Sequence, residues 1–373
     1  MSATRQQSRR GLTLIRILVK SNQQTIAEDK PQNPLLMLSL SFKAYEMPLR
    51  HPFTISRYTV NVQKTMIACI TDGIISGYGE ATVNPYYNST IERLSESFSR
   101  AQPLISKVSE LHPADLWRLL EPHLFDNYFA LCAIDIAYWD YFSRKNNRTL
   151  RSYFSDSAST PLTSYTIGID SIDVMKQKII EMPWPIYKIK LGTKHDIQIV
   201  EELRKISNAV FRIDANGSWT ADQAIENSFA LKDLNVEFIE QPLAADDIAG
   251  MKKVKSASAL PLIADESCQR SEDVLKCSDT FHGINIKLMK CGGITPALDM
   301  IETARKHDLL LMAGCMTESS VGISALTQIA PLLDYIDADG ALLLSQDIAR
   351  GVTFEQGRIH YSGNFGSGVE ICK

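Results

Sequence analysis

The chain has 373 residues, of which 45% are hydrophobic and 22% charged, and a formal net charge of −4. That length exceeds what one hydrophobic core usually supports, so we expect one large domain and a second, smaller one. The slightly acidic balance argues against nucleic acid as a partner. No stretch approaches the ~20 consecutive apolar residues of a membrane-spanning helix, which argues against a membrane as a partner.

The first 36 residues have a different character from the rest. Arg9 and Arg10 precede the apolar run GLTLIRILV, which faintly resembles the start of a signal peptide. However, Arg16 interrupts this run, and no small-residue cleavage site follows at the right distance. We therefore predict a disordered extension over residues 1–36, upstream of a start at Met37.

The number and spacing of the cysteines indicate the cellular compartment in which the protein works. There are seven, an odd number, and they are scattered without the paired spacing of a zinc site or a disulfide framework. This usage favours a reducing environment, so we expect a cytoplasmic protein. The sequence leaves open whether the chain forms a homo-oligomer.

Residues 37–160 are predicted to form an α+β domain. Between residues 38 and 82 apolar and polar residues alternate in three stretches, separated by turn signals such as DG, which is typical of an antiparallel meander. Apolar residues then recur at intervals of three and four, which predicts helices. These helices are expected in NSTIERLSESFSRAQPLISKV, HPADLWRLLEPHL and YFALCAIDIAYWDYFSRK.

After residue 160 short apolar strands alternate with longer amphipathic stretches every ~25 to 30 residues, the spacing of βα units. Eight such units close most naturally into a barrel of the TIM type. A doubly wound open sheet is the alternative, but its Gly-rich phosphate-binding fingerprint is absent. The eight predicted strands are SYTIGID, YKIKL, FRIDANG, EFIEQP, PLIADES, GINIKLM, LLLMAGC and ADGALLL.

Carboxylates stand at the ends of three consecutive predicted strands, where a barrel places its catalytic groups. They are Asp214 in RIDANG, Glu240 in FIEQP and Asp265 in IADES. Taken singly, each has a structural explanation, as a helix cap or the partner of a lysine. Three converging carboxylates repel one another unless a cation joins them, and an all-oxygen site with room for water favours Mg²⁺ over zinc.

Three lysines flank these carboxylates. Lys188 and Lys190 alternate along one predicted strand, so both side chains point to the same face, and Lys287 ends a strand on the opposite side of the barrel mouth. A lysine beside another cation can be neutral near pH 7 and can then act as a base. One lysine would remove the α-proton of a bound carboxylic acid, Mg²⁺ would stabilise the enediolate, and the other lysine would return the proton on the opposite face.

Taken in order, KIK, DANGSW, IEQP, ADES and INIKLMKCGG resemble the muconate-lactonizing subgroup of the enolase superfamily. The resemblance extends from about residue 38 over nearly the whole chain. It implies an α/β fold, a modified (β/α)7β TIM barrel with an N-terminal α+β capping domain. We assign the barrel to residues 161–345 and expect residues 346–373 to pack back on the capping domain.

The resemblance also implies a role for each strand-end residue. Asp214, Glu240 and Asp265 would be the Mg²⁺ ligands. Lys190 and Lys287 would be the two acid/base catalysts, with Lys188 as a helper beside the substrate's carboxylate.

One further motif narrows the expected activity. Asp337 and Asp339, in YIDADGALLL, stand two residues apart just before the eighth predicted strand and would share one face if extended. In the dipeptide epimerases of this subgroup an Asp-x-Asp here binds the α-ammonium group of the substrate. The resemblance thus implies a Mg²⁺-dependent isomerase acting on dipeptides, whereas the simpler explanation is two solvated turn aspartates before Gly340.

The side-chain preference for the dipeptide is left open. Arg57, in PFTISRYTV, would suit an acidic second residue, as in Ala-Glu, through charge-assisted hydrogen bonds, or it is an ordinary surface arginine. Phe53 in the same stretch favours a hydrophobic dipeptide instead, and Ser267, Met316 and Glu318 are also expected near the pocket.

Three rival functions remain. An o-succinylbenzoate synthase or a cycloisomerase on the same scaffold would act on substrates without an ammonium group, and Asp337 and Asp339 argue against it. A Schiff-base aldolase would use one barrel lysine and would need no metal triad. A barrel that only binds a ligand would not need two lysines, a helper and three carboxylates together.

Overall fold

The computed structural model describes residues 37–108 and 110–372. The extension predicted over residues 1–36 lies outside this part of the chain. Among the described residues, no helix combines the length and the apolar character needed to cross a membrane.

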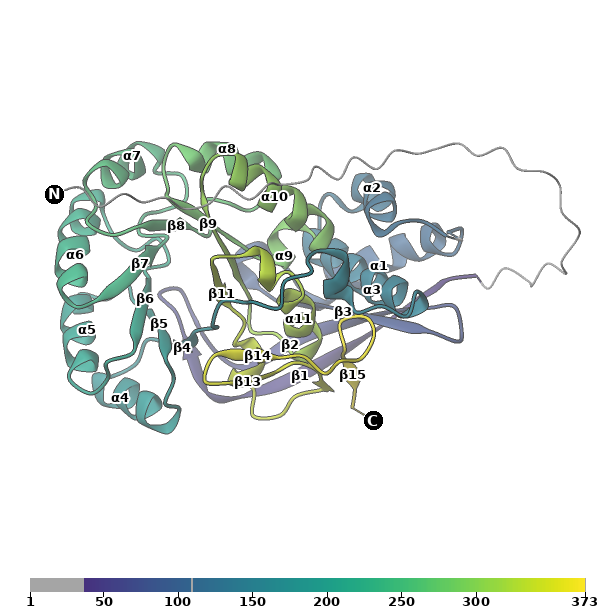
Figure 1. Cartoon of the computed structure of the whole chain (residues 1–373), viewed down its shortest axis with the longest axis horizontal. Coiled ribbons are helices and arrows are strands. Elements are labelled where there is room, and N and C mark those ends of the chain that lie inside the picture. The colour runs from purple at the N-terminus through teal and green to yellow at the C-terminus, as the bar shows by residue number, and fades with distance from the viewer. Residues whose placement is uncertain (1–36, 109, 373) are drawn as a thin grey trace, which may run out of the picture. The chain divides into compact units, whose positions relative to one another are not determined.

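The N-terminal part begins with a three-stranded antiparallel sheet, as the alternating pattern predicted. Its strands are β1 (Ser39–Thr54), β2 (Thr59–Thr71) and β3 (Ser76–Thr82), paired in the order β1-β2-β3. Three helices follow at the predicted stretches and lie beside this sheet (Figure 1): α1 (Ile91–Ile105), α2 (Pro113–Leu124) and α3 (Tyr128–Lys145).

Helix α3 lies against β3 at very short range. A Cβ atom on Gly79 would stand 2.0 Å from the carbonyl oxygen of Ala133, and one on Gly77 would stand 2.2 Å from the backbone nitrogen of Tyr141. Only glycine permits this approach, which explains the GYG in a strand otherwise suited to larger side chains.

The second part is an eight-stranded parallel sheet in the order β4 to β11, curled into a barrel with helices outside (Figure 1). Its ends meet through a parallel bridge between Thr163 and Ile336, so the predicted α/β barrel with a capping domain is confirmed. The strands are β4 (Tyr165–Ile167), β5 (Ile186–Lys190), β6 (Val210–Asp214), β7 (Val236–Glu240), β8 (Leu262–Ala264), β9 (Gly283–Ile286), β10 (Leu310–Gly314) and β11 (Tyr335–Asp337).

Helices connect the barrel strands as βα units require. They are α4 (Ile172–Glu181), α5 (Asp196–Arg204), α6 (Ala221–Asp233), α7 (Ile248–Ala257), α8 (Ser271–Ser278), the short α9 (Leu288–Cys291), α10 (Ile294–Lys306) and α11 (Ser320–Thr327). A buried, parallel sheet of this kind needs apolar strands covered on their outer face, which the amphipathic helices supply.

The position predicted for the eighth strand was wrong. The strand is Tyr335–Asp337, whereas Gly340–Leu343, inside the predicted ADGALLL, forms a 3₁₀ helix, η4. Pairing with β10 ends when Gly314 meets Asp337. Gly340 then packs where a Cβ would stand 2.6 Å from the Met316 carbonyl oxygen, so the chain leaves the sheet at this point.

The last residues form two small antiparallel pairs, β12 (Ala349–Arg350) with β15 (Glu370–Ile371) and β13 (Thr353–Glu355) with β14 (Arg358–His360). Hydrogen bonds link this segment to α3. The backbone N–H of Ser367 donates to Asp140 at 2.7 Å, and Arg144 donates to the Val369 carbonyl oxygen at 2.5 Å.

Candidate active site

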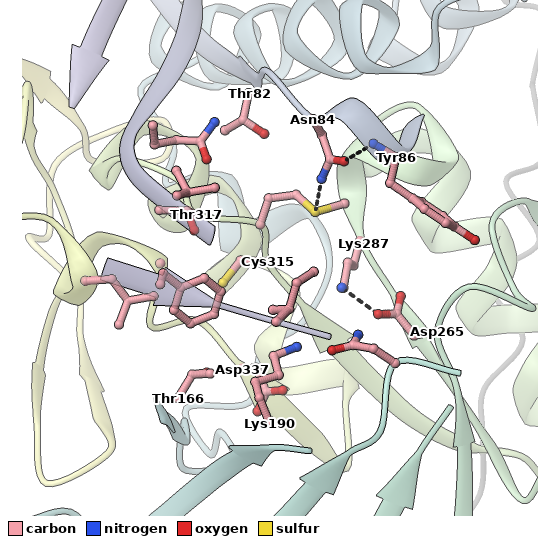
Figure 2. A pocket seen from close by; sticks show the side chains of 18 of the residues that line it. Thr82, Asn84, Tyr86, Thr166, Lys190, Asp265, Lys287, Cys315, Thr317 and Asp337 are labelled. Atoms are coloured by element: carbon pink, nitrogen blue, oxygen red, sulfur yellow. Dashed lines mark hydrogen bonds and ion pairs between the residues drawn. The ribbon is translucent and has the colours of Figure 1, made fainter. Parts of the chain in front are cut away.

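A pocket lies at the carboxyl ends of the barrel strands, where β1 and β2 of the N-terminal domain reach the barrel (Figure 2). The two parts are joined around it, since Ser345 donates its backbone N–H to the Pro48 carbonyl oxygen and Ile169 does the same to Thr54. The predicted site residues that line the pocket are Phe53, Arg57, Lys188, Lys190, Asp265, Lys287, Met316, Asp337 and Asp339.

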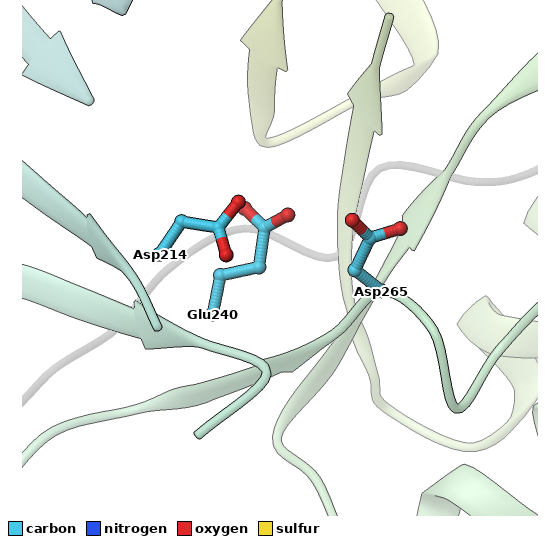
Figure 3. A group of neighbouring side chains, drawn as sticks. All are labelled: Asp214, Glu240 and Asp265. Carbon is cyan, nitrogen blue, oxygen red and sulfur yellow. The ribbon is translucent and has the colours of Figure 1, made fainter. Parts of the chain in front are cut away.

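The other two predicted residues, Asp214 and Glu240, are fully buried beside the third carboxylate, Asp265 (Figure 3). Each of the three offers an oxygen, and these oxygens lie within 4.8 Å of one another. Buried carboxylates this close repel, so burial and then the charge of Asp214 raise the pKa of Glu240. The parallel register explains the convergence, because Asp214 is paired directly with Glu240.

This donor set fits a divalent cation. Its oxygens come from three neighbouring strand ends, and carboxylate oxygen is the ligand that Mg²⁺ prefers. Moreover, Glu240 Oε2 is buried and accepts no hydrogen bond, although Lys188 Nζ lies 2.6 Å away. No other group of three or more metal-binding side chains occurs among residues 37–108 and 110–372.

The lysines face the carboxylates from two sides. Lys190 Nζ lies 2.5 Å from Asp214 Oδ2, and Lys287 Nζ lies 2.6 Å from Asp265 Oδ2. Lys190 belongs to β5 and Lys287 follows β9, so amines stand on opposite sides of the site, as Figure 2 shows.

The charge state of these lysines follows from their neighbours. Burial opposes the positive charge of Lys287, but Asp265 outweighs it and raises the pKa of this amine. The pKa of Lys188 is raised in the same way, chiefly by Asp337 and then by Glu240. A cation bound to the carboxylates would offset their charge and lower the pKa of Lys287, which a general base requires.

Two residues that sequence reasoning missed hold the carboxylates in place. Lys290 Nζ donates to Asp265 Oδ1 at 2.7 Å and to its carbonyl oxygen at 2.6 Å, and Asn285 Nδ2 donates to Glu240 Oε1 at 2.9 Å. Signals for both were present in INIKLMKCGG, because Asn285 precedes Lys287 by two strand positions and Lys290 is a second lysine in a run that is mostly apolar.

Asp337 and Asp339 both reach the pocket but differ in charge balance. Asp337 is 2.8 Å from Lys188 and 3.7 Å from Arg212, and these cations lower its pKa against the effect of burial. Asp339 accepts a hydrogen bond from the Thr166 backbone N–H at 2.6 Å, and burial and the charge of Asp337 raise its pKa to about 6. Asp339 is therefore the carboxylate better placed to receive a cation from a ligand.

The residues expected to govern side-chain preference also line the pocket. Arg57 is already engaged, because it donates to Glu266 at 2.7 Å and to the Asn216 carbonyl oxygen at 2.9 Å. Its guanidinium also stacks on Tyr86, 4.3 Å from the ring centre. The side-chain amide of Asn84 donates to the sulfur of Met316 at 3.6 Å (Figure 2). The roles predicted for Arg57, Phe53 and Met316 in side-chain preference remain predictions.

Comparison with known families identifies the class of protein. Residues 39–153 match the mandelate racemase / muconate lactonizing enzyme N-terminal domain, and residues 171–373 match the family described as enolase C-terminal domain-like. The chain therefore belongs to the enolase superfamily, in the mandelate racemase and muconate lactonizing enzyme family.

Individual relatives point to one branch of that family. An L-Ala-D/L-amino acid epimerase of Flavobacterium johnsoniae is 50% identical over 335 residues, covering 90% of this chain and 100% of the relative. The substrate-liganded L-Ala-D/L-Glu epimerase from Bacillus subtilis has a TM-score of 0.85 at 27% identity, covering 89% of this chain and 98% of that chain. A dipeptide epimerase from Enterococcus faecalis, complexed with Mg and L-Leu-L-Tyr, has a TM-score of 0.83 at 28% identity, covering 89% and 99%.

Proposed function

We infer that the protein is a Mg²⁺-dependent dipeptide epimerase, an isomerase that inverts one α-carbon by moving a proton between two lysines. The observation that carries this inference is the arrangement of Lys190 and Lys287 on opposite sides of three clustered carboxylates. The same interpretation is supported by an epimerase that is 50% identical to this chain and by an epimerase that shares its fold.

The metal would be held by Asp214, Glu240 and Asp265. When bound, Mg²⁺ supplies positive charge that stabilises the substrate's carboxylate as the α-carbon loses its proton. Lys290 and Asn285 keep the carboxylate oxygens oriented through the hydrogen bonds described above.

The chain's own amines move the proton. One of Lys190 and Lys287, deprotonated at Nζ, removes the α-proton, while the other, protonated at Nζ, delivers a proton to the opposite face. Lys188 lies between Asp337 and Glu240, so it supplies a fixed positive charge beside the substrate carboxylate. All three lysines are buried, so their charges act in a low-dielectric setting, where electrostatic effects are stronger than in water.

The amino end of the dipeptide would bind at Asp339, with Asp337 beside it. An α-ammonium group needs an anionic partner, and Asp339 is the pocket carboxylate without a close lysine or arginine among the described residues. A cycloisomerase or an o-succinylbenzoate synthase has no cation to place there, so these alternatives are not favoured.

The remaining assignments are part of this proposal. The capping domain spans residues 37–160, the barrel spans residues 161–345, and the segment 346–373 returns to the capping domain. We place the enzyme in the cytoplasm because all seven cysteines are free, which suits a reducing compartment. A homo-oligomer stays a prediction, to be measured by light scattering after gel filtration.

The decisive experiment is a dipeptide panel incubated with the protein and Mg²⁺ in D₂O and followed by proton NMR. We expect the α-proton signal of the second residue to be lost and the epimer to appear, with both Ala-Glu and Ala-Leu in the panel. Exchange in no dipeptide, together with exchange in another carboxylic acid, would refute the proposed substrate class.

A further inference from the structure

A second pair of buried carboxyl groups lies behind the pocket, apart from the carboxylates and lysines described above. Glu80 belongs to β3 and is fully buried, and Glu318 precedes α11 and is 5% exposed. Their oxygens approach one point, because a Cβ atom on Gly322 would stand 2.1 Å from Glu318 Oε2 and 3.2 Å from Glu80 Oε2. Two buried carboxyl groups this close do not both carry charge at low cost.

Glu80 is the member suited to be ionised. It accepts hydrogen bonds from Ser319 N at 3.1 Å, Ser319 Oγ at 2.5 Å, Gly322 N at 2.9 Å and Thr65 Oγ1 at 2.8 Å. Burial raises the pKa of Glu80, and these hydrogen bonds act in the opposite direction. Its carboxylate thus ties the capping domain to the N-terminus of α11, where a helix favours negative charge.

Glu318 is the member suited to be neutral. It accepts one hydrogen bond from the Met316 backbone N–H at 2.7 Å. Burial and the charge of Glu80 raise the pKa of Glu318 to about 8, while Lys287 is the cation that acts against them. The other titratable groups facing it are the thiols of Cys132 and Cys315, whose own pKa values are raised well above normal by burial.

The backbone segment that Glu318 holds packs against the residue next to Asp339, where the amino end of the dipeptide is proposed to bind. A Cβ atom on Gly340 would stand 2.6 Å from the Met316 carbonyl oxygen and 2.8 Å from the Glu318 backbone nitrogen. Gly340 directly follows Asp339, so a shift of the Met316–Glu318 backbone would move the Asp339 carboxylate. Met316 and Thr317 themselves line the pocket.

We propose that Glu80 and Glu318 are positioning residues: Glu80 anchors α11 to the capping domain, and an uncharged Glu318 holds the Met316–Thr317 backbone against Gly340 and Asp339. This inference rests on the proposed function, in which Asp339 receives the substrate's α-ammonium group. Neither Glu80 nor Glu318 makes a hydrogen bond or an ion pair with Lys190 or Lys287. We therefore expect Glu80 and Glu318 to affect substrate binding more than proton transfer.

Two variants of Glu318 test the proposal with the full-length enzyme, Mg²⁺ and Ala-Leu. Glu318→Gln keeps the shape of a neutral carboxyl group and the acceptor for Met316, so kcat and KM at pH 7 should stay within about twofold of wild type. Glu318→Ala removes the acceptor and should raise KM about tenfold, with kcat within about threefold. The matched control is Glu302→Gln, which changes an exposed glutamate on α10 that pairs with Lys306.

The pH profile separates positioning from simple stability. Above pH 8 the wild type should lose kcat/KM through ionisation of Glu318, and Glu318→Gln should lose about threefold less by pH 9. A dipeptide's own α-ammonium group also titrates near pH 8, so only the difference between the two enzymes on the same substrate counts.

Several results would overturn the proposal. These are a large loss of activity in Glu318→Gln at pH 7, identical pH profiles for the two enzymes, or a Glu318→Ala effect confined to kcat. Failure of the proposed function is distinct, because the wild type itself would then epimerise no dipeptide. If Glu318→Ala does not fold, Glu318→Gln and the pH profile still decide the matter.

Discussion

The barrel mouth and the capping domain contribute to the same pocket in different ways. The barrel supplies the opposing charges, with three lysines against five carboxylates at its strand ends, all of them buried. The capping domain supplies one arginine, already paired with Glu266, together with the apolar and aromatic side chains of β1, β2 and their turn. In the proposed mechanism, reaction chemistry therefore belongs to the barrel, while the capping domain lines the other side of the pocket.

The largest expected effect comes from removing either of the two acid/base lysines of the barrel. Lys190→Ala and Lys287→Ala should each reduce epimerisation by ~10³-fold or more, because general acid–base catalysis is worth about that much. Each variant should still exchange the α-proton of one epimer with D₂O, since the remaining lysine serves one face. Proton NMR on each separate epimer measures this, and unchanged turnover in Lys190→Ala would exclude the two-base mechanism.

Removal of the metal should have an effect of similar order. EDTA treatment is expected to abolish epimerisation, and added Mg²⁺ should restore it. Asp214→Asn should weaken Mg²⁺ binding by at least tenfold in calorimetry, because it removes a charged oxygen ligand. Activity that survives EDTA, or trapping of a lysine adduct with borohydride, would favour a Schiff-base enzyme instead.

A smaller effect is expected where the substrate's amino end binds. Asp339→Asn should raise KM for Ala-Leu about 10- to 100-fold, as a charge-assisted hydrogen bond is worth roughly 1.5–3 kcal/mol. The variant should lose little with an N-acylated amino acid, which carries no ammonium group, so this substrate is the internal control. An equal rise in KM for both substrates would show that Asp339 does not bind the ammonium group.

The contribution of the capping domain to substrate preference can be measured by removing the ion-pair partner of Arg57. Glu266→Gln removes the negative charge that lies 2.7 Å from the guanidinium. The ratio of kcat/KM for Ala-Glu over Ala-Leu should then rise about threefold to tenfold, because the freed arginine attracts an acidic side chain. Arg57→Ala is the paired control and should not raise that ratio.

The smallest effect on turnover, and a clear one on stability, is expected at Glu318. Its pKa is about 8 in the folded protein and ~4.3 when unfolded, so the stability contributed by its proton is present at acidic pH and lost as pH rises through 8. Relative to wild type, Glu318→Gln should gain ~1 kcal/mol per pH unit between pH 5 and 8. Thermal unfolding across this range measures it, and a constant difference in Tm would contradict it.

The sequence predicted the position of a residue well wherever the order of strands and helices alone fixes that position. Asp214, Glu240, Asp265 and Lys287 follow apolar strands, so a parallel barrel must bring them to one end. The eighth strand was misplaced because its pairing covers three residues only, and its end is decided by contact between Gly340 and the Met316 backbone. Glu318 was expected near the pocket, but its closeness to Glu80 was missed, since these two residues lie far apart in sequence and belong to different domains.

By itself, then, the sequence determined the barrel, the capping domain and the set of lysines and carboxylates, because strand period and βα repetition are local properties of the chain. Only the tertiary structure decided how these charges are shared. It pairs Asp337 with Lys188 but gives Asp339 only the Thr166 backbone N–H as a close partner among the described residues, and it joins Arg57 to Glu266 across the domains. Charge balance depends on distance and burial, and both are set when the two domains close on each other.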